Sequence, residues 1–163
     1  MLKNVFYRFA VLCLVMGALS FVGCGDGAGG GNLIGTWTST FGESYTITTD
    51  TVTYDAGAMG AEFSYAGTIR NAPNFANPYG IIIIEYTQKP TYYDYGPAPD
   101  YAKTNPHIPV NNFQAIYWKD LTTASVGLAQ TNEEEKATLS DATAAFTLDN
   151  ESTYISYYGG YSK

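Results

Sequence analysis

Apolar and polar positions alternate along most of the chain from residue 35 onward. On either side of a corner at residues 49–51, Tyr45, Ile47, Val52 and Tyr54 alternate with threonines. A period of two is that of a β-strand with one buried face, and β-branched threonine suits the solvated face. The pattern therefore predicts short strands at residues 35–40, 45–47, 52–54, 63–70, 81–86, 113–119, 124–130 and 153–158.

Two segments depart from this alternation. Residues 81–84 are four consecutive isoleucines, which predicts a strand buried on more of its surface than its neighbours. Leu139, Ala142 and Phe146 have helical spacing, with Ser140 as the expected N-cap. Up to eight strands joined mostly by short turns predict an all-β fold, a small up-and-down antiparallel β-barrel with one short helix before the last strand. The alternative is an open β-sandwich.

The N-terminus has the features of a secretory signal peptide. Lys3 and Arg8 precede apolar residues 9–22, which as a helix would span about 21 Å, short of a hydrocarbon core of roughly 30 Å. The segment ends in Gly23 and Cys24, and this ending resembles the lipobox of bacterial lipoproteins, in the looser form familiar in spirochaetes. The resemblance implies cleavage after Gly23 and lipidation of Cys24. The alternative is an ordinary signal peptide followed by an unrelated cysteine.

Processing at this point would divide the chain into three segments: a signal peptide at 1–23, the lipidated cysteine with a glycine-rich tether at 24–32, and a barrel domain at 33–163. The lipid would attach the protein to a membrane. Gly25 stands where enterobacterial lipoproteins retained at the inner membrane carry aspartate, so the outer membrane is favoured, on its periplasmic or surface face. Loss of Lys3 and Arg8 leaves six basic against 15 acidic residues, which lowers the formal charge from −7 to −9.

Composition and charge exclude several classes of function. The acidic excess lacks the basic stripe that nucleic-acid binding requires, so no nucleic-acid partner is expected. Gly25, Gly27 and Gly30 spell G-x-G-x-x-G, but a strand instead of a helix follows them, so they predict a linker and no cofactor site. His107, the only histidine, is expected in an exposed proline-rich loop, and the acidic run at 133–135 in a solvated loop. No metal site, cofactor or enzymatic activity is expected.

The first strand carries a motif with a family resemblance. Gly35-Thr36-Trp37, followed by a glycine corner and a second alternating strand, resembles the start of lipocalins and avidins, in which the tryptophan closes one end of the barrel. Together with residues 117–121 and 139–146, this region is also similar to uncharacterised lipoproteins of treponemes. Lipocalins often stack a late-strand arginine on that tryptophan, whereas the only arginine beyond the signal peptide is Arg70, in the middle of the chain.

Aromatic residues of the predicted strands are the first candidate site. They share the parity of the aliphatic residues, so we expect them to point into the barrel. There they would either line a cavity for a small apolar or aromatic ligand or simply fill the core. These residues are Trp37, Tyr45, Tyr54, Tyr65 and Tyr86.

The connection at residues 89–112 is the second candidate site. It holds five of the seven prolines together with Tyr92, Tyr93, Tyr95 and Tyr101, and connections of this length are usually functional or disordered. The tyrosines would either contact a cell-surface protein or glycan or fold back over the barrel mouth. The sequence thus predicts a membrane-anchored, non-catalytic binding module for a small apolar or aromatic ligand. The alternative is a surface interaction or structural lipoprotein acting through this loop.

Overall fold

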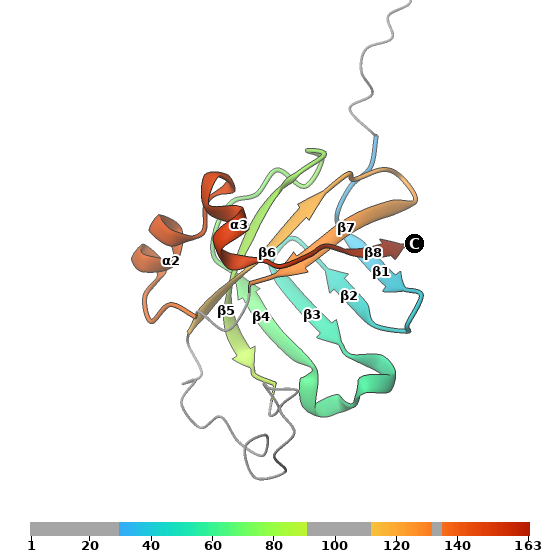
Figure 1. Cartoon of the computed structure of the whole chain (residues 1–163), viewed down its shortest axis with the longest axis horizontal. Helices are drawn as coiled ribbons and strands as arrows, with labels where there is room; N and C mark the ends of the chain where they lie inside the picture. Colours follow the sequence, from blue (N-terminus) through green and yellow to red (C-terminus); the bar gives the residue numbers. More distant parts are fainter. Residues whose placement is uncertain (1–29, 91–111, 132–134) are drawn as a thin grey trace, which may run out of the picture.

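The computed structural model describes residues 30–90, 112–131 and 135–163. They form a closed antiparallel β-barrel in which each strand pairs with the next and the last returns to the first, so the predicted barrel is confirmed. In Figure 1, β8 lies beside β1, and the pairs Thr38–Ser162 and Ser39–Tyr161 join them. The strands are β1 (Gly35–Ser39), β2 (Ser44–Ile47), β3 (Thr51–Asp55), β4 (Tyr65–Ile69), β5 (Gly80–Gln88), β6 (Phe113–Lys119), β7 (Ser125–Gln130) and β8 (Gly159–Ser162).

Burial follows the alternation that predicted the strands. In β3, Val52 and Tyr54 are buried while the residues on either side of them are exposed. In β5, three successive isoleucines are buried, because Ile82 and Ile84 enter the barrel core whereas Ile83 packs into a second cluster on the outside. The continuous apolar run therefore has the predicted extra burial, and its cause is a strand covered on both faces.

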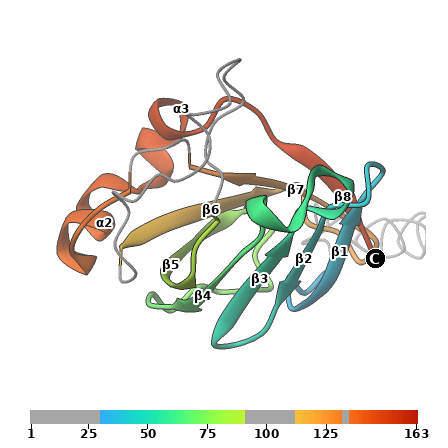
Figure 2. The ribbon, with the colours of Figure 1, turned by 90° about the horizontal axis from the view of Figure 1, so that it is seen from below.

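The outer cover consists of helices α2 (Leu139–Ala145) and α3 (Glu151–Tyr154) with a 3₁₀ turn between them at Leu148–Asn150. Figure 2 shows both helices outside the barrel, on the side of β5 and β6. The predicted N-cap was wrong: Thr138, in an extended conformation, accepts a hydrogen bond from the Asp141 amide at 3.1 Å, and Ser140 lies inside the helix. Across the described ranges, no helix combines the length and apolarity needed to cross a membrane.

The expected strand at 153–158 was also wrong. Helix α3 ends at Tyr154, and Tyr154, Ile155 and Tyr158 pack against the outer cluster, outside the barrel. The last strand starts later, at Gly159, and only Tyr161 from it enters the barrel core. The error arose because residues 153–158 are rich in types that favour strands.

The connection between β3 and β4 covers one end of the barrel. It contains two 3₁₀ turns, Gly57–Met59 and Ala61–Phe63, so the fourth strand begins at Tyr65 and not at residue 63 as predicted. Met59 and Phe63 are half-buried and pack against the barrel core. We call this end, where β1 and β3 finish, the tyrosine end; the opposite end, where β1 starts, is the tryptophan end.

Candidate functional site

Strand register brings the predicted aromatic residues into one row inside the barrel. Trp37 lies opposite Tyr45, Tyr45 opposite Tyr54, and Tyr54 opposite Tyr65, which spans β1 to β4. Tyr86 continues the row on β5, where it lies opposite Gly67, two residues after Tyr65. All five side chains are buried, so their predicted inward orientation is confirmed. We call these five residues the aromatic row.

The tyrosine rings of the row contact one another. Ring centroids are 4.8 Å apart for Tyr45 and Tyr54, 5.1 Å for Tyr54 and Tyr65, and 5.6 Å for Tyr65 and Tyr86. Tyr161 of β8 joins them, 5.3 Å from Tyr45 in an edge-to-face arrangement. Tilted and edge-to-face rings at these distances are the favourable geometries for aromatic pairs. The tyrosine end is therefore an aromatic cluster in mutual contact.

Side chains satisfy the hydroxyl groups of this cluster. The Tyr65 hydroxyl donates to the Tyr45 hydroxyl at 3.3 Å. Glu43, from the turn between β1 and β2, accepts from Tyr54 at 3.2 Å and from Tyr161 at 3.4 Å. Because buried hydroxyls are costly without partners, these bonds let polar groups remain in an apolar interior.

A second polar connection runs from the cluster to the strand β6. The Tyr86 hydroxyl donates to Oε1 of the Gln114 side chain, and Nε2 of the same side chain donates to the Thr131 backbone carbonyl at 2.9 Å. Gln114 is 1% exposed, although it lies in a strand that is otherwise apolar on its buried positions. Burial of this glutamine is tolerated because both the oxygen and the nitrogen of its side-chain amide have a hydrogen-bond partner.

Burial keeps the tyrosine hydroxyls protonated. Desolvation raises the pKa of Tyr45 and of Tyr65 well above the usual value. Neighbouring tyrosines raise the pKa of Tyr45 further, whereas for Tyr65 the nearby Tyr86 raises it and the hydrogen bond to Tyr45 lowers it. Burial, followed by the Glu43 carboxylate, also raises the pKa of Tyr161. At neutral pH the hydroxyls of Tyr45, Tyr65 and Tyr161 are therefore neutral.

The tryptophan end is closed by bonds to the backbone. The indole nitrogen of Trp37 donates to the Leu33 carbonyl at 2.7 Å, and that of Trp118 donates to the Asn77 carbonyl at 3.0 Å. The ammonium group of Lys163 lies 4.4 Å from the Trp37 ring centroid. The Lys163 ammonium therefore covers the Trp37 ring at this end of the barrel.

Three residues of the tyrosine end were not among the predicted site residues. Glu43 lies in a turn, where the alternation of strands says nothing about direction. Gln114 had a detectable signal, because it shares the inward parity of Ile116. Tyr161 follows two glycines, which removed the pattern needed to place it.

The acidic run at 133–135 was expected in a solvated loop, and for Glu135 this expectation was wrong. Its side chain is 4% exposed and pairs with the Lys89 ammonium at 3.1 Å, and Asn112 donates to the same carboxylate at 3.3 Å. Burial lowers the pKa of Lys89, whereas Glu135 acts in the opposite direction. The ion pair ties the residues after β5 to those after β7, and burial of Glu135 is possible because Lys89 and Asn112 compensate its charge.

Several predicted residues lie outside the described ranges. They include Cys24, His107, Glu133 and Glu134. The loop tyrosines Tyr92, Tyr93, Tyr95 and Tyr101 also lie there. Among residues 30–90, 112–131 and 135–163, no group of three histidine, cysteine, aspartate or glutamate side chains is placed to hold a metal ion.

The described residues also form a groove of about 650 Å³ on the outer surface of the barrel, over β1, β7 and β8. It shares Tyr161 with the tyrosine cluster and is otherwise separate from it. The aromatic row and this groove are therefore two independent candidate sites. In comparisons with protein-family models, curated proteins and solved structures, nothing matches this chain.

Proposed function

We propose that this protein is an exported, lipid-anchored binding protein without catalytic activity, which holds a small apolar or aromatic ligand at the tyrosine end of its barrel. The observation that carries the proposal is the tyrosine cluster. Its four tyrosines of the aromatic row and Tyr161 have contacting rings, and their hydroxyls bond to the side chains of Glu43, Gln114 and one another, which can change rotamer. Such a surface can exchange ring-to-ring contacts for contacts with a ligand ring at little cost.

A ligand would reach the tyrosine end through the β3–β4 connection. Met59 and Phe63 pack on the core from two short 3₁₀ turns, with no strand pairing of their own. A ligand that displaced Phe63 would take its place against the barrel core, while the barrel strands stayed paired. Segments of this kind, with few backbone bonds to the rest of the fold, open at low free-energy cost.

A lipid anchor on Cys24 would turn the tryptophan end of the barrel toward the membrane. The chain enters the barrel at the tryptophan end, where Leu33 is buried and its amide donates to the Phe75 carbonyl at 2.9 Å. A lipid on Cys24 would hold this end toward the membrane through the glycine-rich tether, which reaches about 16 Å in r.m.s. terms for eight residues. The tyrosine end would then face away from the lipid, open to solutes.

The anchor is tested by membrane fractionation of cells that produce the Cys24→Ser variant. We expect this variant to leave the membrane fraction, because serine lacks the thiol to which the lipid would be attached. Cys13→Ser is the matched control, since Cys13 lies within the signal peptide, and it should stay at the membrane. Persistent membrane attachment of Cys24→Ser would refute the anchor.

Ligand binding is tested by native mass spectrometry of the whole lipoprotein extracted from its own organism. We expect a small molecule to co-purify with the wild type and to be lost from Tyr65→Leu, which keeps apolar volume but removes the ring and hydroxyl. Tyr117→Phe is the control, because Tyr117 is buried in the outer cluster under the helices. Repeated absence of any bound small molecule from the wild type contradicts this function.

A second candidate is contact with a protein or glycan at the cell surface through the 89–112 connection. Two exposed aromatic side chains elsewhere on the described surface favour surface contact in general: Phe41 at the β1–β2 turn is 82% exposed and Tyr157 is 79% exposed. Single exposed apolar residues are common, so this candidate ranks below the first. A protein in place of a small molecule in the same mass spectra would reverse that order.

A further inference from the structure

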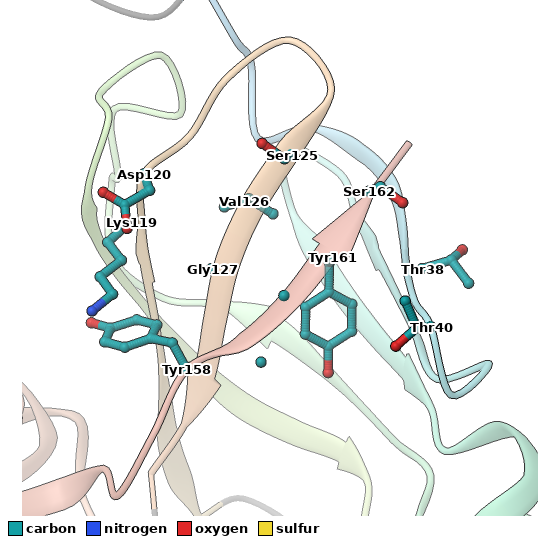
Figure 3. Close-up of a pocket in the computed structure, with 12 residues that line it drawn as sticks. Thr38, Thr40, Lys119, Asp120, Ser125, Val126, Gly127, Tyr158, Tyr161 and Ser162 are labelled. Atoms are coloured by element: carbon teal, nitrogen blue, oxygen red, sulfur yellow. The ribbon is translucent and has the colours of Figure 1, made fainter.

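The outer groove has two walls of different chemistry. Figure 3 shows Tyr158 and Lys119 on one side and Thr38 and Thr40 on the other, with β7 and β8 between them. The Lys119 ammonium lies 4.1 Å from the centroid of the Tyr158 ring. One wall is therefore aromatic and cationic, and the opposite wall carries hydroxyl groups.

Register explains how the floor between the walls is built. Lys119 lies opposite Gly127 and Gly127 opposite Gly160, which gives one row across β6, β7 and β8. In the next row Ser125 lies opposite Ser162 and Ser162 opposite Thr38. The residues alternating with them, Trp118, Val126, Tyr161 and Trp37, are buried in the barrel, so both rows face outward. The groove thus has a floor without side chains beside a row of three hydroxyls.

The fold does not require glycine at this floor. A Cβ on Gly160 would meet nothing within 4 Å, and one on Gly127 would make ordinary contacts of 3.4 Å or more. By contrast, a Cβ on Gly80 would lie 2.2 Å from the Trp118 ring, so packing does demand glycine there. Glycine weakens a strand interior, and one reason for its presence is the close approach of a ligand.

We propose that this groove binds a short neutral glycan, independently of the ligand at the tyrosine end. A sugar ring has flat C–H faces that pack on an aromatic ring or on bare backbone, and hydroxyls around its edge that exchange hydrogen bonds. The Gly127–Gly160 floor matches the faces, the edge of the Tyr158 ring beside Lys119 closes one side, and Ser125, Ser162 and Thr38 match the hydroxyl edge. The volume of about 650 Å³ lies within the usual range for small-molecule sites.

Charge selects a neutral glycan over an anionic one. Lys119 and Asp120 both line the groove, so its own charges are balanced. The chain as a whole is acidic, at −7, and would repel a polyanion at long range. Lys119 and Asp120 instead offer a donor and an acceptor for sugar hydroxyls.

The test is isothermal titration of the whole lipoprotein, in a detergent without a sugar headgroup, with maltotriose, cellotriose, chitotriose and the acidic trigalacturonate. We expect at least one neutral trisaccharide to bind, and trigalacturonate not to bind. Gly160→Val should weaken that binding about tenfold or more by filling the floor, which corresponds to about 1.4 kcal/mol. Its Tm should not fall, because valine suits a strand and its Cβ has open space.

Two further variants separate this site from the rest of the barrel. Tyr158→Leu should also weaken trisaccharide binding about tenfold, the conversion of about 1.4 kcal/mol. Thr53→Val, on the exposed face of β3 outside the groove, is the matched control and should bind as the wild type does. Tyr65→Leu, which tests the tyrosine end, should leave sugar binding intact. No binding of any neutral trisaccharide, or wild-type binding by Gly160→Val, overturns the proposal.

Discussion

The two ends of the barrel use aromatic residues in opposite ways. At the tryptophan end, both indole nitrogens donate to main-chain carbonyls, which fixes each ring relative to the backbone. At the tyrosine end, the hydroxyls of the cluster bond to Glu43, Gln114 and one another, all of which are side chains. A ring held by the backbone closes the fold, whereas rings held by side chains can repack. The difference indicates a structural role for the first end and supports our proposal that the second end binds a ligand.

Truncation at the tryptophan end should have the largest effect on stability. Trp37→Ala removes a fully buried ring and leaves a cavity, so we expect the free energy of unfolding to fall by about 3–5 kcal/mol. Urea denaturation followed by circular dichroism measures it. Trp37→Phe keeps an aromatic ring but loses the bond to Leu33 and should lose less. A loss below that of Tyr65→Leu would contradict the assignment of structure to this end.

The tyrosine end should make the stability of the fold depend on pH in the alkaline range. Folding raises the pKa of Tyr45 and Tyr65 above the unfolded value. Their contribution to stability is therefore fully present below pH about 10 and is lost as the pH rises further, by about 1.4 kcal/mol per pH unit for each group. We expect cooperative alkaline unfolding, measured by circular dichroism together with tyrosinate absorbance.

Tyr45→Phe is the control for this pH dependence, because it removes one of the two groups and leaves the ring. The slope of stability against pH above 10 should decrease in this variant. Titration of Tyr45 and Tyr65 without any loss of the fold would show that their hydroxyls are accessible to solvent, and would break the contrast between the two ends.

Sequence alone predicted the architecture better than the polar details of the site. Alternation located the aromatic row and the doubly covered β5, because the period of a strand decides which face each side chain takes. It gave no direction for Glu43, which lies in a turn, and none for the bonds among hydroxyls, which depend on register between strands far apart in the chain. The last strand was misplaced because residues 153–158 are rich in types that favour strands, although helix α3 ends at Tyr154 and strand pairing begins only at Gly159.

Loss of the buried glutamine should have an intermediate effect. Gln114→Leu removes the acceptor of the Tyr86 hydroxyl and the donor to the Thr131 carbonyl. Leaving buried polar groups without their partner costs about 1–3 kcal/mol, so urea denaturation should show a loss of that size. Gln114→Glu keeps the acceptor but loses the amide donor and serves as the comparison. A neutral effect of Gln114→Leu would mean that water replaces the glutamine at this end.

The smallest effect on stability is expected at Lys163. This residue tests whether the cation or the Trp37 indole bond holds the tryptophan end closed. Its ammonium lies over Trp37 and donates to the Asn32 and Ile34 carbonyls at 3.0 and 3.3 Å, but the residue is exposed. Lys163→Met should cost about 0.5–1 kcal/mol, the usual value of a cation–π contact at an exposed site, while Lys163→Arg should retain it. Urea denaturation measures both variants. If Lys163→Met cost as much as Trp37→Ala, the cation and not the indole bond to the backbone would hold this end closed.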